Sequence, residues 1–373
     1  MDVSLIVIVV IVTALAFDFT NGFHDTANAM ATSIATGALK PRVAVGISAV
    51  LNLVGAFLSV EVAKTISSGI VDETKITPAV IFAGLVGAIV WNLLTWLLGL
   101  PSSSSHALFG GLIGATWIAS GGDAVHFAQV VQKVLIPALA SPLVAGVVAG
   151  IGTFIVYRMT ASARQDVVGK TFKTGQVLSA SLVSLAHGTN DAQKTMGVIT
   201  LTLITSGSLA ANSSPPVWVI LAAGTAIGLG TYLGGWRIIQ TMGKKLTEIQ
   251  TPQGFAAETS AAAVILASSH LGFALSTTHV CSGGIIGSGV GRKLAEVRWG
   301  VAGKMVIAWA LTLPAAAIVG ALASVVSTKG DVGTVLVAVA GIAVALAVYL
   351  ISKRNPVNAK TIAEPEPSVP AAV

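Results

Sequence analysis

Residues Gly22–Met30 read GFHDTANAM, and residues Gly188–Met196 read GTNDAQKTM. The two stretches share a glycine, an aspartate and a methionine at matching positions, and their aspartates, Asp25 and Asp191, are 166 residues apart. Both stretches interrupt sequence that is otherwise largely apolar. A polar motif that recurs in this way indicates a duplicated chain whose two halves contribute matching groups.

A second pair of motifs supports the duplication. Residues Ser103–Gly114 read SSSHALFGGLIG, and residues Ser276–Gly287 read STTHVCSGGIIG. Their histidines, His106 and His279, are 173 residues apart. Because the two pairs of motifs occur in the same order and at similar intervals, they predict two halves that repeat one architecture.

The composition points to the membrane. Of the 373 residues, 54% are apolar and only 10% are charged, whereas a soluble domain has about 25% charged residues. The mean hydropathy is +0.86. These values exclude a cytosolic enzyme, a disordered chain and a nucleic-acid-binding module. The single cysteine, Cys281, also excludes a disulfide framework. We therefore expect an all-α polytopic membrane protein.

Apolar segments of about 20 residues predict membrane spans. The candidates are Val43–Val60, Ala79–Leu98, Val134–Tyr157, Val217–Trp236, Thr251–Leu271, Val301–Val326 and Val335–Ile351. Other apolar segments contain polar or glycine-rich motifs and predict broken or re-entrant helices, which membrane proteins tolerate where the backbone is covered or lines a cavity. These segments are Asp2–Leu39, Leu100–Ile118, Gln176–Ile204 and Gly272–Val290.

The distribution of basic residues predicts the orientation. Clusters that hold 16 of the 21 lysines and arginines are expected in the cytoplasm. They are Lys40/Arg42, Arg158–Lys173, Arg237–Lys245, Arg292–Lys304 and Lys353–Lys360. This assignment gives the two halves opposite orientations. An inverted-topology repeat with interrupted segments at matching positions is typical of a secondary transporter with its site near the midplane.

The same assignment divides the chain into four parts. We expect a first repeat over residues 1–157, a cytoplasmic loop over 158–175, a second repeat over 176–352, and a disordered cytoplasmic tail over 353–373.

Asp25 and Asp191 are the acids that the duplication singles out. A carboxylate inside the bilayer is costly unless it is paired, which makes both candidate functional groups. Asn28 is three residues after Asp25 and Asn190 directly precedes Asp191, so each half supplies carboxylate and amide oxygens for a coupling cation. The alternative is that the acids only cap broken helices. Glu258 and Asn52 lie inside predicted spans, where they line a cavity or bond a neighbouring helix. We group Glu258 with Asp25, Asn28, Asn190, Asp191 and Lys194 as the candidate coupling-ion residues.

The hydroxyl-rich runs precede glycine-rich helices. Hydroxyls and free backbone N–H groups at a helix N-terminus bind anions. The candidate anion ligands are Ser103, Ser104, Ser105, Ser276, Thr277 and Thr278. The alternative is ordinary N-capping. The nearby histidines are either satisfied neutral residues or proton-sensitive groups, and they are His24, His106, His187 and His279.

Lys194 has no counterpart in the first half, where the matching position is Asn28. It follows Asp191 by three residues, so on a helix the two side chains are neighbours. A lysine in an apolar span needs a partner, and Asp191 is the nearest candidate. A fixed ammonium here would take the place of a bound sodium ion, with a proton providing the coupling. The alternative is a salt bridge that only locks the helix.

Nothing in the motifs predicts an enzyme or a resident metal. The serines have no G-x-S-x-G context, and the histidines do not have the spacing of zinc ligands.

At these motifs the chain resembles the inorganic phosphate transporter (Pit) family, and specifically its bacterial low-affinity branch. The resemblance rests on Gly22–Asn28, Pro101–His106, His187–Gly197 and Ser276–His279. It implies an inverted-repeat carrier that moves orthophosphate with a cation.

The resemblance also implies roles for residues. It places Asp25, Asn28, Asn190 and Asp191 at the coupling-ion and phosphate centre, and the two hydroxyl runs in contact with phosphate. Sodium-coupled members usually have asparagine at the position of Lys194 and glutamate at the position of Asn52, while Glu258 fits the family pattern. The bacterial branch is associated with protons and metal–phosphate complexes, so we expect proton coupling.

We therefore predict a multi-pass plasma-membrane symporter that imports inorganic phosphate together with a proton or sodium ion, and we expect no cofactor. A divalent metal bound to the phosphate and a homo-oligomer are compatible with this prediction, and no nucleic-acid partner is expected. The alternatives are a carrier of another tetrahedral oxyanion, such as sulfate, and a passive anion channel. Moving one negative charge inward against 100 mV costs about 2.3 kcal/mol, so accumulation of phosphate requires cations that a channel does not need.

Overall fold

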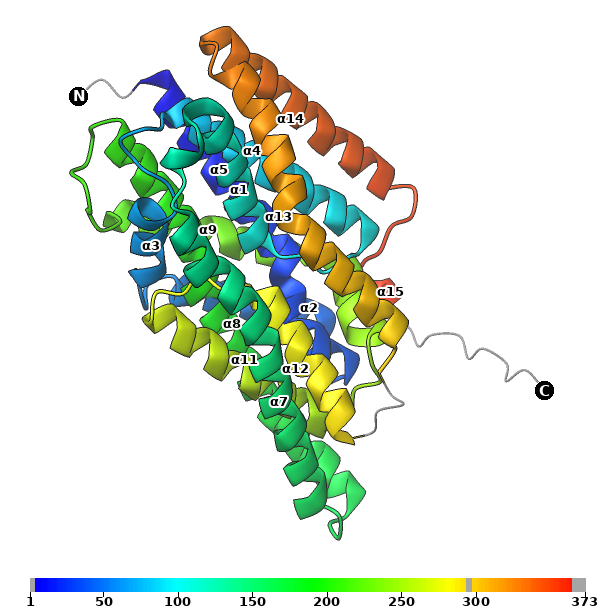
Figure 1. Ribbon diagram of the computed structural model, residues 1–373. Helices are drawn as coiled ribbons and strands as arrows, with labels where there is room; N and C mark the ends of the chain where they lie inside the picture. Colours follow the sequence, from blue (N-terminus) through cyan, green and yellow to red (C-terminus); the bar gives the residue numbers. More distant parts are fainter. Residues whose placement is uncertain (1–3, 293–296, 364–373) are drawn as a thin grey trace.

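The structure, a computed structural model, describes residues 4–292 and 297–363. These residues form a helical bundle (Figure 1). The longer helices are α1 Leu5–Ala35, α2 Pro41–Gly55, α4 Pro78–Leu98, α5 Ser104–Ser120, α7 Ile136–Met159, α8 Gln165–Thr205, α9 Val217–Leu233, α11 Thr251–His270, α12 Thr277–Arg292, α13 Trp299–Ser327 and α14 Asp331–Ser352. Shorter pieces are α3 Glu61–Gly69, α6 Phe127–Val130, α10 Trp236–Gln240, α15 Ala359–Ala363, the 3-10 turn Gly122–Ala124 and the π-helical turns Val131–Leu135 and Thr241–Lys245.

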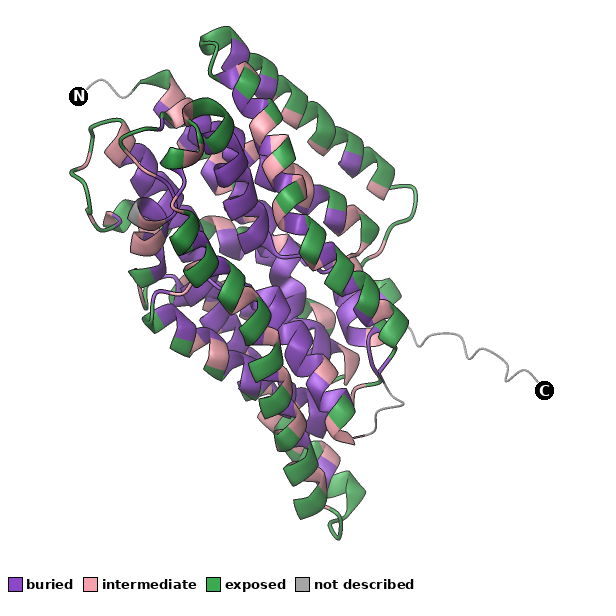
Figure 2. Ribbon diagram, viewed as in Figure 1, coloured by how far each residue is buried: buried purple, intermediate pink, exposed green. Residues whose placement is uncertain are grey.

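The surface of the bundle is that of a membrane protein. Among the described residues, five helical segments are long and apolar enough to cross a bilayer, or six if α9 and the following Trp236–Lys245 segment, bent by 60°, form one span. Side chains such as Leu139 on α7 and Ile342 on α14 are 73% and 68% exposed, as lipid-facing residues would be. Figure 2 shows exposed residues along α7, α13 and α14, and buried residues in the centre. The expected multi-pass helical membrane protein is confirmed.

The helices α1 and α8 correct one prediction. Segments Asp2–Leu39 and Gln176–Ile204 were expected to be broken, but α1 runs without interruption over Leu5–Ala35 and α8 over Gln165–Thr205. Neither helix contains a proline, and the polar side chains of the motifs find partners on other helices. The backbone hydrogen bonds therefore continue through both motifs.

The other two interrupted segments do begin outside helices. Residues 99–103 join α4 to α5, and residues 271–276 join α11 to α12, so that each pair forms a helical hairpin. Pro78 is the first residue of α4 and Pro252 is the second residue of α11, in the first turn where the missing N–H of proline costs nothing. The loops are buried at Ser103 and Ser276. The start of α5 also meets the second loop, because the hydroxyl of Ser105 donates to the carbonyl oxygen of Leu275 at 3.0 Å.

Gly22 and Gly188, the first residues of the two recurring aspartate motifs, allow helices of the two predicted halves to pack closely. A Cβ atom on Gly22 of α1 would collide with the carbonyl oxygen of Ile227 on α9, and one on Gly188 of α8 would collide with that of Asn52 on α2. Similarly, α5 packs on α13 and α12 packs on α7. These pairings are what a duplicated half predicts, and the inverted relation between the halves stays a prediction.

Three boundaries differ from the predictions. The helix predicted over Val43–Val60 ends at Gly55. The predicted loop 158–175 is mostly helical, because α7 reaches Met159 and α8 begins at Gln165. The predicted disordered tail contains α15, whose Ile362 is buried, and the tail prediction for residues 364–373 lies outside the described residues.

Basic clusters meet at one end of the bundle. A guanidinium nitrogen of Arg237 donates to the carbonyl oxygen of Ser352 at 3.0 Å, and one of Arg298 donates to that of Lys244 at 2.6 Å. By the positive-inside rule we expect this end to face the cytoplasm.

Candidate functional site

The aspartates of the two recurring motifs meet in the centre of the bundle. Asp25 on α1 and Asp191 on α8 are 1% and 0% exposed. Together with His187, they place ligand atoms within 4.8 Å of one another. The sequence did not predict this cluster, because His187 becomes a neighbour of Asp25 only when α1 and α8 pack together. Two carboxylates and an imidazole could hold a cation.

Asp25 connects α1 to the start of α5. One carboxylate oxygen, Oδ1, lies 2.6 Å from Nδ1 of His24, and the other, Oδ2, accepts a hydrogen bond from the hydroxyl of Ser104 at 2.9 Å. The remaining ring nitrogen of His24 is 3.1 Å from the hydroxyl oxygen of Thr95. Asp25 is therefore not a helix cap, and its two oxygens reach groups that can exchange protons or hydrogen bonds.

Asp191 is held by a cation. The Lys194 ammonium donates to Oδ1 at 2.7 Å, which confirms the pairing expected from their spacing. Oδ2 accepts from the side-chain amide of Asn21 at 3.2 Å and from the hydroxyl of Thr277 at 3.4 Å. His187 Nε2 lies 3.4 Å from the same oxygen.

The hydroxyl runs divide into capping and inward-facing groups. Ser103 accepts a hydrogen bond from the backbone N–H of His106 at 3.1 Å, and Ser276 accepts one from that of His279 at 3.2 Å. These two hydroxyls therefore act as N-caps.

The residues that follow the caps face the acidic centre. Ser104 and Thr277 donate to the two acids, while Asn28 donates to the hydroxyls of Thr277 and Thr278 at 3.3 and 3.1 Å. The partial positive charges at the N-termini of α5 and α12 thus lie next to two carboxylates and one ammonium. Such a centre can attract a cation to the acids and an anion to the helix starts.

Asn190 faces the hairpin loop after α11. Its side-chain amide donates to the hydroxyl of Ser269 at 2.9 Å and to the carbonyl oxygen of Phe273 at 3.4 Å. The amide oxygens of Asn190 and Asn28 are both buried without a hydrogen-bond partner. They are acceptors that a cation or a water molecule would satisfy.

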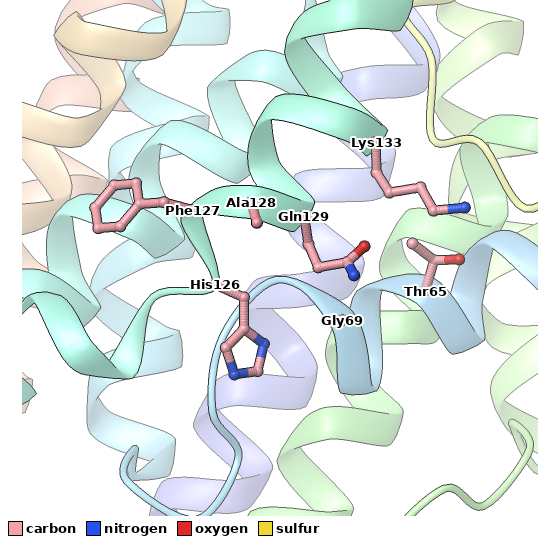
Figure 3. A pocket seen from close by; sticks show the side chains of 7 residues that line it. All are labelled: Thr65, Gly69, His126, Phe127, Ala128, Gln129 and Lys133. Carbon is pink, nitrogen blue, oxygen red and sulfur yellow. The ribbon is translucent and has the colours of Figure 1, made fainter.

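Two residues that line a pocket of about 630 Å³, Thr65 and Lys133, contact this loop (Figure 3). Figure 3 shows the side chains of Thr65, His126, Gln129 and Lys133 at this pocket. The ammonium of Lys133 lies 4.6 Å above the ring of Phe273. A cation thus stands over the loop that contacts Asn190.

Glu258 belongs to a separate polar cluster. Its carboxylate accepts hydrogen bonds from the hydroxyls of Thr32, Ser33 and Ser179 and from the amide of Gln176. These partners lie on α1 and α8, on the turns nearer the basic end of the bundle. The structure therefore does not bring Glu258 into contact with Asp25 or Asp191, and its coupling role stays a prediction.

The remaining polar candidates bond to other helices or stack. Asn52 donates to the hydroxyl of Thr231 at 2.8 Å, and its amide oxygen lies 3.1 Å from His187 Nδ1. His279 donates from Nδ1 to the carbonyl oxygen of Ala138 at 3.2 Å. Its ring centroid is 4.8 Å from that of His106. Of the histidines, His24 and His187 are thus the ones beside the acids.

Asp18 and Asn21 are buried polar residues that the sequence reasoning missed. Both are 0% exposed. With Asp25 and Asn28 they recur at intervals of three or four residues, which places all four on one face of a helix. That spacing was the available signal, and it was hidden by the assumption that α1 is broken.

Known proteins resemble this chain over most of its length. Residues 21–320 match the phosphate transporter family. The chain is 58% identical to a probable low-affinity inorganic phosphate transporter of Mycobacterium tuberculosis, over 95% of this chain and 85% of that protein. It is 44% identical to a protein of the same description from Bacillus subtilis, over 87% of this chain and 98% of that protein.

A solved structure described as the sodium-dependent phosphate transporter has a similar fold. It superimposes with a TM-score of 0.71 at 25% sequence identity, over 86% of this chain and 98% of that one.

Proposed function

The chain belongs to the phosphate transporter family, and from this premise we propose that it imports inorganic phosphate across the plasma membrane by proton symport. It is a multi-pass transporter and not an enzyme. Phosphate transport is the activity named for its relatives from Mycobacterium tuberculosis and Bacillus subtilis. The proton is the part of the proposal that rests on this chain's own residues.

One observation carries the proposal: the starts of α5 and α12 face the two acids of α1 and α8. In this arrangement Ser104 donates to Asp25 and Thr277 to Asp191. A phosphate at the helix starts meets the carboxylates at close range, so their negative charge must be compensated first. A cation at the acids removes this repulsion, and binding of the cation and binding of phosphate then favour each other.

The Lys194–Asp191 pair supports a proton over sodium. With Lys194 bound to Asp191 at 2.7 Å, one acid already has its positive charge, and a second fixed cation beside it is repelled. Protonation of Asp25, whose Oδ1 lies 2.6 Å from His24, neutralises the remaining charge without adding an ion that needs several oxygen ligands.

The test is phosphate uptake by purified protein in proteoliposomes under separately imposed gradients. We expect accumulation with an inward proton gradient in sodium-free buffer, and competition by arsenate but not by sulfate. Strict dependence on a sodium gradient would contradict proton coupling while preserving the phosphate assignment. Accumulation with no cation gradient would contradict symport, and sulfate uptake would contradict the substrate.

The same vesicles address the form of the substrate. We propose that the carried species includes a metal–phosphate complex, because a neutral complex reduces the charge that the acids must balance. Uptake of labelled divalent metal with phosphate, in equal amounts, is the expected result. Uptake that is unchanged when divalent metals are chelated would show that free phosphate is carried.

A further inference from the structure

Asp18 is a buried acid without a counterion. It lies on α1, two helical turns before Asp25, and it is 0% exposed. Neither carboxylate oxygen has a hydrogen-bond partner, and the polar side chains nearest to it are Asn21 and Thr195. An unpaired carboxylate inside a membrane protein is costly unless it is neutralised, so something other than these neighbours must compensate its charge.

The neighbours of Asp18 are rich in acceptors. The amide oxygen of Asn21 and the hydroxyl of Thr195 are also buried without partners. The amide nitrogen of Asn21 is already directed to Asp191, at 3.2 Å. Asn21 thus stands between the unpaired acid and the paired one, and its free oxygen is available to accept a hydrogen bond.

The charged groups that face Asp18 are Asp191 and Lys194 of α8, and they are bound to each other. The helices α4 and α9, which also pack on α1, contain no charged residue. The other charged or titratable groups of helices in contact with α1 have partners or positions elsewhere, and they are His24, Asp25, Arg42, His106, Asp166, Lys170, Lys173, His187, Tyr232, Arg237, Lys244, Lys245, Glu258, His270, His279, Cys281 and Arg292.

We propose that Asp18 is a proton-binding site of the transporter, separate from the Asp25–Asp191 centre and protonated in this conformation. A metal cation takes about six oxygen ligands, whereas Asp18, Asn21 and Thr195 offer four oxygens beside the Lys194 ammonium. A proton needs one carboxylate oxygen. It converts the carboxylate to a carboxylic acid, whose O–H can donate to the free amide oxygen of Asn21.

This site deepens the proposed phosphate–proton symport and rests on it. Asn21 connects Asp18 to Asp191, so loss of the proton from Asp18 places a second negative charge next to the Lys194–Asp191 pair. The Lys194 ammonium would then be attracted to both carboxylates, because it is the nearest cation to Asp18 and to Asp191. Protonation of Asp18 therefore fixes Lys194 on Asp191 and leaves the central site ready for phosphate.

The test compares two reactions of the purified protein in proteoliposomes. Exchange of labelled for unlabelled phosphate at equal pH needs no net proton movement, whereas accumulation under a pH gradient does. Each coupled proton multiplies the accumulation ratio about tenfold per pH unit, which corresponds to about 1.4 kcal/mol. We therefore expect Asp18→Asn to retain exchange and to lose about tenfold in accumulation under a gradient of one pH unit. Asp18→Glu should restore the accumulation.

A matched control uses an acid outside the membrane. Asp72→Asn changes a loop carboxylate that is bonded to Thr74 and Lys75, and it should leave both reactions and their pH profiles unchanged. The pH profile of exchange should shift for Asp18→Asn and not for Asp72→Asn.

Three results would overturn the site. Wild-type accumulation and an unshifted pH profile in Asp18→Asn would show that Asp18 carries no proton. Loss of both reactions in Asp18→Asn and in Asp18→Glu would show a structural role. If the wild type exchanges phosphate but does not respond to the pH gradient, no proton is coupled to transport, and the proposed site at Asp18 is refuted. Failure of the wild type to exchange phosphate would instead refute the phosphate assignment itself.

Discussion

The hydroxyl of Ser104 donates a hydrogen bond to Oδ2 of Asp25 over 2.9 Å. Ser104 is the first residue of α5, so this bond joins an anion-attracting helix start to a cation-attracting acid. A proton or metal ion that binds Asp25 competes for the same oxygen and releases the hydroxyl. We therefore expect the cation to bind before phosphate, and we expect the two ligands to increase each other's affinity.

Removal of the carboxylate of Asp25 or of Asp191 should uncouple phosphate transport from the cation. Asp25→Asn is expected to abolish concentrative uptake while the protein still inserts into the membrane, because the amide cannot take up the coupling charge. Uptake under an imposed gradient measures the effect, and elution of the detergent-solubilised variant at the wild-type volume controls for folding. Normal accumulation by this variant would make Asp25 a structural acid.

Asp191→Asn should also abolish concentrative uptake, and it should destabilise the protein as well. The substitution leaves the Lys194 ammonium, which is 0% exposed, without its charge partner, and breaking a buried pair in this way costs about 3–5 kcal/mol. The loss of stability should be smaller in the double variant Asp191→Asn/Lys194→Asn, as measured by thermal unfolding in detergent. Equal stability of Asp191→Asn and wild type would contradict the importance of the pair.

Substitutions in the two hydroxyl runs should have two different effects, on phosphate affinity for the inward-facing hydroxyls and on stability for the capping hydroxyls. Ser104→Ala and Thr277→Ala should raise the phosphate concentration for half-maximal uptake about 10- to 150-fold, because a hydrogen bond to a charged group contributes about 1.5–3 kcal/mol. Ser103→Ala and Ser276→Ala are the matched controls. They remove the N-caps of α5 and α12 and should cost about 1 kcal/mol of stability, with a smaller effect on half-saturation. The same half-saturation in all four variants would leave the runs with a capping role alone.

Helix packing at the glycines of the two recurring motifs is testable without transport. Gly22→Ala should destabilise the protein by about 1–3 kcal/mol, as overpacking does, because the new methyl group collides with the backbone of α9 at Ile227. Gly46→Ala on α2 is the control, since a Cβ atom there meets no atom within 4 Å. It should stabilise its helix by about 0.5–1 kcal/mol. Equal melting temperatures of the two variants would contradict the close approach of α1 and α9.

The sequence predicted what depends on local spacing. The Lys194–Asp191 contact followed from an interval of three residues on a helix, and the helical membrane architecture followed from apolar segments. The sequence could not show which helices pack against each other. For this reason Glu258 was grouped with Asp25, although its carboxylate bonds to Ser33 and Ser179 instead. Polar motifs also suggested breaks in α1 and α8. The helices stay continuous because partners on other helices satisfy the polar side chains while the backbone bonds remain intact.

We expect Lys194 to decide which ion is coupled to phosphate. Its ammonium lies 2.7 Å from Oδ1 of Asp191, at the position that matches Asn28 in the first half. A fixed ammonium supplies the charge that a sodium ion would otherwise bring. We therefore expect the wild type to transport phosphate in response to a pH gradient with little sodium requirement.

Replacing the ammonium should reverse this preference. Lys194→Asn is expected to lose proton-driven uptake, since Asp191 then has no fixed partner, and to gain stimulation by sodium, because a second amide oxygen joins the two acids. Lys194→Arg retains the charge and should keep sodium-independent transport if it folds, which thermal unfolding in detergent checks. Rates of phosphate uptake with choline or sodium outside, at equal pH and under an imposed pH gradient, give the comparison. A wild type that needs sodium and ignores pH would refute the role of Lys194, because the ammonium would then replace no ion.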